Sequence, residues 1–383
     1  FIDIKNMKIL IIDTYYPTFL KKFHYDLKKS ELNNSSFFEH KKVLLSRNFG
    51  TSDFYSRHLN LMGLEAIDII ANDFLLQEKW ENEFLKTNRA SKLVFPSKFF
   101  HLPLCGEFLK RIDFLRYVTL AQIKKITPDI VFCQDVWFFS PKQLQEIKFC
   151  SNLLVGQIAS RLPSDKLLKN FDLILTSFPH FVPRIRNKGV SCEYFKIGFE
   201  TSMFKDLSYQ DRDIPISFIG GITRHHKKSL ELLEYISRKI PIRIYGYGAN
   251  RLPRSSPIRK HHFGEVYGNE MYDILRRSKI TFNRHIDVAE TNANNMRMFE
   301  STGMGSLLIT DKKDNLNDLF HENTEVISYS KKEDALEKIT YFLKNINEAS
   351  EIANRGRQKT HNEHSYSTRM VELIQILDNY LKF

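Results

Sequence analysis

The sequence has 383 residues, of which 42% are hydrophobic and 13% aromatic, and it carries a formal net charge of +12. This length exceeds what one hydrophobic core usually serves, so we expect two domains, and the apolar content excludes wholesale disorder. No run approaches about 18 uncharged apolar residues, which excludes a transmembrane helix, and the first residues lack the basic region and cleavage site of a signal peptide.

The first half of the chain repeats a pattern of apolar strand and helix. Continuous apolar runs that end at polar turns predict buried parallel strands at 7–13, 64–71, 128–135, 152–160 and 171–177. We expect a helix over 52–63 that begins at Ser52 as its N-cap, and aromatic-rich helices within 74–126. Strands that alternate with helices in this way predict an α/β domain with a doubly wound parallel sheet.

A polar, loop-like segment near 200–213 precedes a second pattern of the same kind. Strands are expected at 215–221, 241–248, 278–284, 305–310 and 325–330. Helices are expected at 228–238, 268–277, 293–302 and 331–345, followed by an amphipathic helix over 364–381. We therefore predict two Rossmann-like domains joined near residue 205, with a ligand cleft at the carboxyl ends of their strands.

Cysteine and charge patterns narrow the class of partner. The four cysteines are widely spaced without a CxxC pair, which argues against a zinc site or a disulfide framework and fits a reducing cytoplasm. The histidine pairs at 225–226 and 261–262 are adjacent residues that point apart, so no metal site is predicted. The basic residues are scattered doublets, which favours a nucleotide-linked substrate or an anionic membrane face and not nucleic acid.

Two glycines follow the strand at 215–221, and the segment after them is basic. Gly220 and Gly221 let the backbone approach a ligand closely, and Arg224 and Lys228 add positive charge at the next helix start. This arrangement suits a diphosphate, although neither the GxxxxGK[ST] nor the GxGxxG spacing is present. A tight turn with solvated basic residues explains the motif equally well.

Two further turns of small residues follow, YGYG at 245–248 and GEVYG at 264–268. Main-chain groups at Tyr245, Gly246 and Val266 suit contact with a nucleobase. Plain turns have the same composition, and from composition alone the plain turn is the simpler interpretation.

The segment NNMRMFESTGMGSL, residues 294–307, places the carboxylate of Glu300 against the apolar face of a short helix. One interpretation is an ion pair between Arg297 and Glu300 on the helix surface, which contributes about 0.2–0.5 kcal/mol. The other is that Glu300 accepts hydrogen bonds from a ribose diol. In that case Asn294 and Asn295 form a helix start whose N–H groups face an anion.

Several segments of the second half carry a family resemblance: FIGG, NNMRMFESTGMGSLLITDKKDNLNDLF, EVISYSKKEDALEKITYFL and IANRGRQKTHNEHSY. They resemble the nucleotide-binding domain of GT-B glycosyltransferases, in particular the CgeB-like branch of the glycosyl transferase group 1 proteins. The resemblance covers about residues 215–377. The first half, with GTSDFYSRHLNLMGLEA and PDIVFCQD, is similar to the acceptor domains of the same proteins.

The resemblance implies a GT-B fold, in which two Rossmann-like domains face each other across a cleft. It implies an acceptor-binding domain over 1–205 and a nucleotide-sugar-binding domain over 206–363. The C-terminal helix, 364–383, is expected to cross back and pack on the first domain.

The resemblance also assigns site residues. Glu300 matches the second glutamate of the family's E-x7-E element, which holds the donor's ribose, whereas the first position of that element falls on Asn292 and departs from the pattern. The residues that match the diphosphate-binding region are Gly220, Gly221, Arg224 and Lys228. The turn at 264–268 resembles the loop that contacts the base.

The expected transfer uses a nucleotide-diphosphate sugar as donor substrate and no metal or other cofactor, because no DxD pair lies near the candidate site. If the reaction inverts configuration, a general base is needed, and Asp53 at a helix start is the first candidate. The further candidates are Asp13 and Asp135 at strand ends, then His180 and His24. Asp53 is equally explained as a residue that stabilises the helix dipole, and a retaining reaction needs none of these bases.

The sequence therefore predicts a glycosyltransferase that moves a sugar from a nucleotide-diphosphate donor to a hydroxyl of a glycan or lipid-linked acceptor. The expected process is the synthesis of cell-surface polysaccharide or glycoconjugate, in the cytoplasm and in contact with the inner membrane face. The alternatives are a GT-B-shaped epimerase or glycerophosphotransferase, and a non-catalytic module that binds a nucleotide or glycan.

Overall fold

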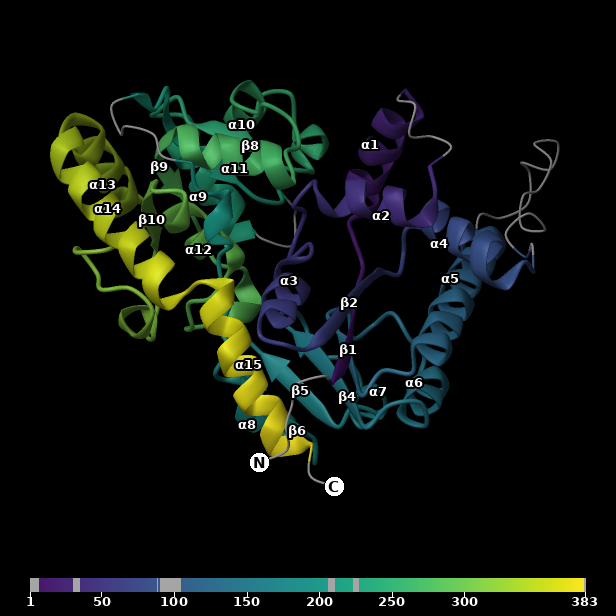
Figure 1. The fold of residues 1–383 in the computed structure, drawn as a ribbon. Helices are drawn as coiled ribbons and strands as arrows, with labels where there is room; N and C mark the ends of the chain where they lie inside the picture. Colours follow the sequence, from purple (N-terminus) through teal and green to yellow (C-terminus); the bar gives the residue numbers. More distant parts are fainter. Residues whose placement is uncertain are drawn as a thin grey trace. The chain divides into compact units, whose positions relative to one another are not determined.

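The computed structural model describes residues 7–29, 35–87, 89, 105–205, 211–222 and 227–381. The chain divides into two compact units. The N-terminal unit comprises Phe1–Thr176, Phe181–Tyr194 and Leu373–Phe383, and the C-terminal unit comprises Ser177–His180 and Phe195–Glu372. Figure 1 labels their elements along the chain.

The N-terminal unit is built on a parallel sheet of six strands in the order β2-β1-β3-β4-β5-β6. The strands are β1 (Lys8–Asp13), β2 (Glu65–Ile70), β3 (Ile130–Cys133), β4 (Leu153–Ile158), β5 (Leu173–Thr176) and β6 (Ser191–Tyr194). The helices are α1 (Pro17–Lys28), α2 (Phe37–Leu45), α3 (Phe54–Leu61), α4 (Phe74–Trp80), η2 (Glu81–Leu85), α5 (Cys105–Ile126), α6 (Pro141–Lys148), α7 (Asp165–Leu168) and α8 (Phe181–Arg186). Strands β3 and β5 are buried along their whole length, as expected of a sheet covered on both faces.

The C-terminal unit has a second parallel sheet, of five strands in the order β11-β10-β9-β7-β8. The strands are β7 (Ile214–Ile219), β8 (Arg243–Tyr245), β9 (Ser278–Phe282), β10 (Leu307–Asp311) and β11 (Ile327–Tyr329). The helices are α9 (Lys227–Ser237), α10 (Pro257–Lys260), α11 (Gly268–Arg277), α12 (Met296–Gly303), α13 (Lys332–Lys344), α14 (Ile346–Glu363) and α15 (Tyr366–Tyr380). Short 3-10 turns lie at Thr201–Met203, Ala249–Arg251, Asp287–Ala289 and Leu316–Asp318.

Hydrophobic residues cover both faces of the second sheet. Leu307 and Ile309 pack in one buried cluster and Leu308 packs in another, because successive side chains of a strand point to opposite faces. The last helix, α15, belongs to both units, and its part from Leu373 onward groups with the N-terminal unit. There Tyr380 donates a hydrogen bond to Glu193 of β6 at 2.6 Å.

The structure confirms the predicted strands and corrects two helix starts. Ser52 is not an N-cap: it has a positive φ of 45°, and its hydroxyl donates to the carbonyl oxygen of Leu45 at 2.6 Å. Asp53 takes the N-cap position of α3 instead, without a side-chain capping bond. Helix α12 begins at Met296 and not at residue 293, because the side chain of Asn295 caps it. The elements that the sequence did not predict include strand β6 and helices α1, α2, α6, α8 and α14.

The turns after β7 and β8 are held together by backbone hydrogen bonds. The N–H of Gly220 donates to the carbonyl oxygen of Tyr245 at 3.0 Å, and the N–H of Gly246 donates to that of Gly264 at 2.9 Å. Gly246 has a φ of 133°, and a Cβ placed on it would lie 2.0 Å from the carbonyl oxygen of Gly220. Only glycine fits this close approach of two backbones.

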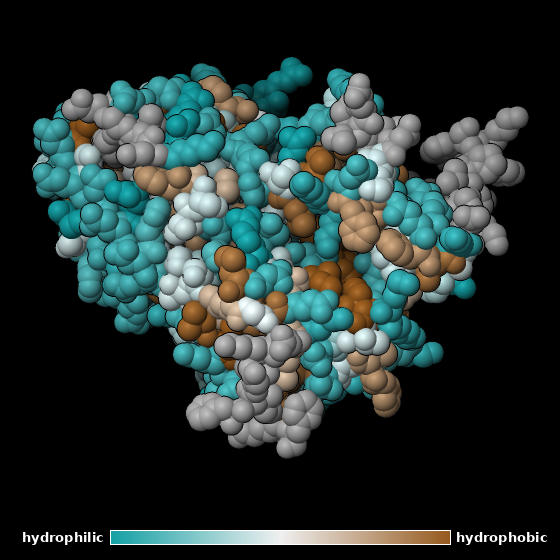
Figure 2. Space-filling view, viewed as in Figure 1, coloured by the Kyte–Doolittle hydropathy of each residue, from teal (hydrophilic) through white to brown (hydrophobic). Residues whose placement is uncertain are grey.

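None of the helices in the described part of the chain combines the length and apolar character that a membrane span requires. On the face shown in Figure 2, hydrophilic residues predominate and hydrophobic surface is confined to small areas.

We expect Gly246→Ala to destabilise the C-terminal unit by about 3 kcal/mol or more. The left-handed backbone costs an L-residue about 1–2 kcal/mol, and the overlap with Gly220 adds a packing cost of about 1–3 kcal/mol. Gly264→Ala is the matched control, because Gly264 has a φ of 94° with no atom within 4 Å of an added Cβ. Urea unfolding of the two variants measures the difference; equal losses would show that the close approach is not a constraint.

Candidate functional site

In the C-terminal unit, the candidate site lies at the carboxyl ends of strands β7 and β8, the edge at which parallel sheets bind ligands. Gly220 and Gly221 directly follow β7, and Gly246 directly follows β8. The backbone bonds described above join these turns to Gly264, in the turn that holds Val266. The structure therefore brings together the three glycine turns that the sequence marked as candidates.

Helix α12 meets this edge through Arg297. The Nε of Arg297 donates to the carbonyl oxygen of Ile219, the last residue of β7, at 3.2 Å. The Nη1 of Arg297 lies 2.7 Å from the Oε2 of Glu300. Glu300 is 5% exposed, so the ion pair is present but buried, and the surface interpretation of it is wrong. Burial raises the pKa of the Glu300 carboxyl, and the charge of Arg297 opposes that rise.

The asparagines before α12 hold the helix start in place. The Oδ1 of Asn295 accepts from the N–H of Met298 at 3.1 Å, and its Nδ2 donates to Asn283 at 3.2 Å. The Nδ2 of Asn294 donates to the carbonyl oxygen of Ser177. The N–H of Met298, in the first turn of the helix, is thus satisfied by the N-cap residue Asn295 and does not face an anion.

Asn292, where the family pattern has a glutamate, contacts a histidine. Its Nδ2 lies 2.9 Å from the Nδ1 of His180, and the Nε2 of His180 lies 3.3 Å from the carbonyl oxygen of Val288. If Asn292 donates, Nδ1 is the acceptor and Nε2 carries the proton. Both ring nitrogens of His180 then have partners, which disfavours this histidine as a general base.

The structure describes only some of the other residues that the sequence predicted to bind the nucleotide sugar. Tyr245 is buried, and its ring lies 5.7 Å from that of Phe263, while Val266 is half-buried. Arg224 lies outside the described residues, as does the side chain of Lys228, so the basic part of the diphosphate site stays a prediction. Sequence reasoning missed Tyr247, which is 41% exposed and whose ring fills the space beside Gly221. Tyr247 is the third residue of the YGYG motif, so the motif could have identified it as a candidate.

A basic pocket of about 660 Å³ lies at the carboxyl ends of β9, β10 and β11, and sequence analysis did not find it. Its lining includes Arg284, Lys312 and Lys331, together with Asp311 at the end of β10. The Oδ1 of Asp311 lies 2.7 Å from the Nδ1 of His285. Burial acts to raise the pKa of Asp311, but the hydrogen bonds and charge of His285 lower it to about 2. This carboxylate is therefore a fixed negative charge and not a proton acceptor near neutral pH.

In the N-terminal unit, two candidate bases meet at the carboxyl ends of β1 and β3. The N–H of Thr14 donates to the Oδ1 of Asp13 at 2.7 Å, and the hydroxyl of Thr14 donates to the Oδ2 of Asp135 at 2.8 Å. Burial raises the pKa of Asp13 to about 7. The hydrogen bond from Thr14 lowers this pKa, and the negative charges of Asp135 and Asp68 raise it further. A carboxyl with this pKa exchanges its proton near neutral pH.

Asp53 has a different environment. Its Oδ1 accepts from the Nη2 of Arg57 at 2.5 Å, one turn along α3. Both residues line a pocket of about 570 Å³ that also contains Lys41 and Lys42 of α2. Because the Asp53 carboxylate is already engaged by Arg57, the geometry favours Asp13 over Asp53 for proton transfer. His24 lies outside this group and contacts Asp73.

Comparison with known proteins gives the fold and a family match for part of the chain. Residues 224–375 match the family described as glycosyl transferase-like. A glycosyltransferase from Rickettsia africae has 15% identity and a TM-score of 0.58, with 98% of this chain and 99% of that chain covered. HepE from Anabaena, solved with UDP-glucose, has 11% identity and a TM-score of 0.58, with 98% and 100% covered. Sucrose-phosphate synthase from Thermosynechococcus elongatus has 12% identity and a TM-score of 0.54, with 73% and 80% covered.

No curated protein sequence matches the chain. The solved structures show the fold, which is GT-B: two α/β domains, each with a parallel sheet. The family match extends over most of the C-terminal unit. The second half of the chain is therefore similar to the glycosyl transferase-like family, as the sequence predicted, and its place in the CgeB-like branch stays a prediction.

The electrostatics of Asp13 predict how stability depends on pH. Since folding raises the pKa of Asp13 from 3.8 to about 7, the folded state loses stability as pH rises through this interval. Asp13→Asn removes the titration and keeps an acceptor for Thr14, so we expect the variant to be more stable than the wild type above pH 7, by about 1–4 kcal/mol. Urea unfolding at pH 5 and pH 8, with the exposed change Asp26→Asn as control, measures this. A constant difference between the two pH values would contradict the assignment.

Proposed function

We propose that this protein is a glycosyltransferase that moves a sugar from a nucleotide-diphosphate donor to a hydroxyl group of a glycan or lipid-linked acceptor. The observation that carries the proposal is the buried Arg297–Glu300 pair at the carboxyl end of β7, inside the region that matches the glycosyl transferase-like family. The presence of UDP-glucose in the HepE structure supports a nucleotide sugar as donor.

In the proposed donor site, Glu300 accepts hydrogen bonds from the two hydroxyls of the ribose. A carboxylate suits a diol because its two oxygens accept from two donors. Arg297 forms an ion pair with Glu300 and also donates to the carbonyl oxygen at the end of β7. These two contacts fix the carboxylate next to the turn of Gly220 and Gly221. The diphosphate lies on that turn, with Arg224 and Lys228 as its cations.

The proposed reaction is inverting and uses no metal. As the bond between the anomeric carbon and the diphosphate breaks, the acceptor oxygen forms the new bond, and the proton of the acceptor hydroxyl passes to Asp13. The developing charge on the nucleoside diphosphate is stabilised by main-chain N–H groups and basic side chains. Asn292 provides no carboxylate at the first position of the family element, so the proposal assigns it no part in the chemistry.

The acceptor is proposed to bind the N-terminal domain, 1–205, and the donor the C-terminal domain, 206–363. Lys41, Lys42 and Arg57 make the pocket beside Asp53 complementary to a phosphate, as in a lipid-linked acceptor. The net charge of +12 supports contact with an anionic membrane face. The described cysteines Cys133, Cys150 and Cys192 are unpaired, which supports the cytoplasm as the compartment.

Nucleotide binding tests the donor half of this proposal. We expect UDP, GDP, dTDP or CMP at millimolar concentration to raise the melting temperature in a saturable manner, because a ligand that binds only the folded state stabilises it. Glu300→Gln is expected to weaken binding about 10- to 100-fold with an intact fold, since a charged hydrogen-bond acceptor is lost.

Glu351→Gln on the exposed surface of α14 is the matched control and is expected to bind like the wild type. Stabilisation by none of the nucleotides would contradict the enzyme proposal and favour a binding module for another ligand. Equal binding by Glu300→Gln and the wild type would leave Glu300 a structural residue. Turnover of the donor without an acceptor would favour an epimerase.

The base assignment predicts a pH profile. We expect kcat/KM for sugar transfer to rise with pH through about 7 as Asp13 loses its proton, and Asp13→Asn to reduce kcat about 10²- to 10⁴-fold while donor binding is retained. Asp53→Asn is expected to keep the profile and most of the turnover. The reverse result, with loss in Asp53→Asn alone, would restore Asp53 as the base; full activity in both variants would indicate a retaining reaction.

A further inference from the structure

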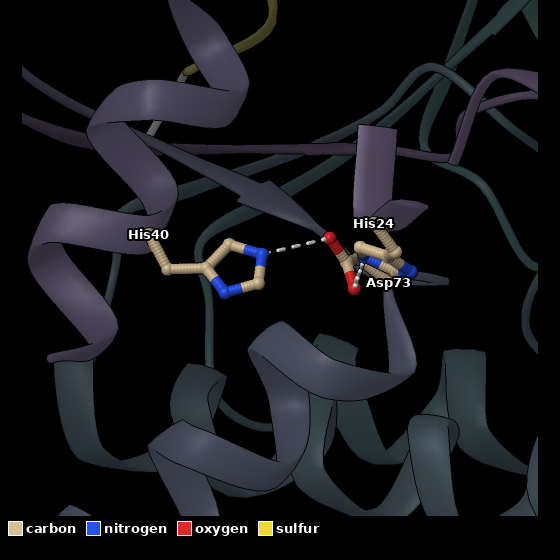
Figure 3. A group of neighbouring side chains, drawn as sticks. All are labelled: His24, His40 and Asp73. Carbon is tan, nitrogen blue, oxygen red and sulfur yellow. Dashed lines mark ion pairs between the residues drawn. The ribbon is translucent and has the colours of Figure 1, made fainter. Parts of the chain in front are cut away.

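The N-terminal unit contains a second group of functional side chains outside the candidate site. It consists of His24 of α1, His40 of α2 and Asp73, which directly precedes α4. Each offers one donor atom, and these atoms all lie within 4.8 Å of one another. Figure 3 shows the two imidazole rings approaching the carboxylate from different helices.

The spacing of the three donors suits a metal ion. The Nε2 of His24 lies 2.9 Å from the Oδ1 of Asp73, and the Nε2 of His40 lies 3.4 Å from the Oδ2. Zinc binds nitrogen and oxygen at about 2.0–2.2 Å, so the ligand atoms of a tetrahedral site lie about 3.3 Å apart. An ion between these donors therefore needs small movements of side chains only.

The hydrogen bonding of the cluster is a separate observation that points to a ligand. His40 and Asp73 are both 0% exposed. Apart from these ion-pair contacts with one another, neither ring nitrogen of His40, nor the Nε2 of His24, nor the Oδ2 of Asp73 makes a hydrogen bond of good geometry within the described residues. Buried polar atoms in proteins are almost always satisfied, and here several unsatisfied atoms converge on one point.

An ion pair between the histidines and Asp73 explains the cluster less well than a bound metal ion does. Two protonated imidazoles beside one carboxylate place a net positive charge in a buried position, which is costly. Two neutral imidazoles directed at Asp73 leave the buried Nδ1 of His40 without a partner among the described residues, and their contacts with the carboxylate lack good hydrogen-bond geometry. A divalent cation bound by neutral imidazoles satisfies the converging lone pairs, and Phe23, 5.5 Å from His24 and 5.6 Å from His40 between ring centroids, provides an apolar shell.

We propose that His24, His40 and Asp73 form a binding site for a divalent transition-metal ion, with Zn²⁺ as the best match to two imidazoles and one carboxylate. The His24 side chain is 18% exposed, which leaves access for a water molecule as fourth ligand. The Oδ1 of Asp73 also accepts from the N–H of Leu76 at 3.2 Å, which orients the carboxylate. The ion joins α1, α2 and the start of α4, which is a structural role without contact to substrate.

The test begins with the full chain stripped by a chelator and dialysed. We expect it to take up one Zn²⁺ per molecule, measured by elemental analysis, and its melting temperature to rise with Zn²⁺ concentration. Co²⁺ is expected to give the intense visible absorption of a tetrahedral site. Failure of the wild-type chain to retain a stoichiometric ion overturns the proposal, whatever the variants do.

Asp73→Asn is the most informative variant, because asparagine still caps α4 but is a poorer metal ligand. His24→Asn removes a second ligand at the partly exposed position. We expect each to weaken Zn²⁺ binding more than about 100-fold, beyond the 10- to 100-fold effect of outer-shell changes. His58→Gln on α3, which lies outside the cluster, is the control and is expected to bind like the wild type. Equal affinity of Asp73→Asn and wild type would show adventitious binding and also overturn the proposal.

Discussion

The buried ion pair between Arg297 and Glu300 is the interaction on which the candidate donor site depends. A buried pair contributes little net stability, because the cost of removing two charges from water roughly cancels their attraction. Here Arg297 also donates to the carbonyl oxygen of Ile219, so the pair connects α12 to the end of β7. Such a pair is better explained by the position it gives the carboxylate than by the stability it adds. The glycine turns supply the rest of the site because they let the backbones of Gly220 and Gly246 meet.

The sequence predicted most of the fold for a simple physical reason. Strands of a parallel sheet are buried on both faces, so they appear as continuous apolar runs such as ILIID and SLLIT. Two of the missed elements, β6 and α14, lack this signal. Strand β6, SCEY, lies at the edge of its sheet and is polar, and α14 contains glycine and many polar residues. Both form because tertiary packing overrides weak local preference.

The site was less predictable than the fold, since its chemistry depends on residues that are distant in the sequence. The order of the candidate bases illustrates this. The sequence placed Asp53 first for its position at a helix start, but the ion pair that engages its carboxylate, with Arg57, is visible only in the structure. The elevated pKa of Asp13 depends on burial and on the charges of Asp135, which follows β3, and Asp68 of β2. The histidines adjacent in the sequence were weighed as metal ligands, whereas the cluster that forms combines residues from three separate elements.

Helix α2 links the electrostatics of the N-terminal unit to that cluster. Its residue His40 is buried beside Asp73, and the next residue, Lys41, lines the pocket that contains Asp53. Burial lowers the pKa of Lys41 and the charge of Asp68 opposes this, while the same charge of Asp68 raises the pKa of Asp13. Any displacement of α2 therefore moves Lys41 relative to Asp68 and changes the field at Asp13. An ion held by His40 would fix the position of α2, and in this way it would influence the proposed base without contacting substrate.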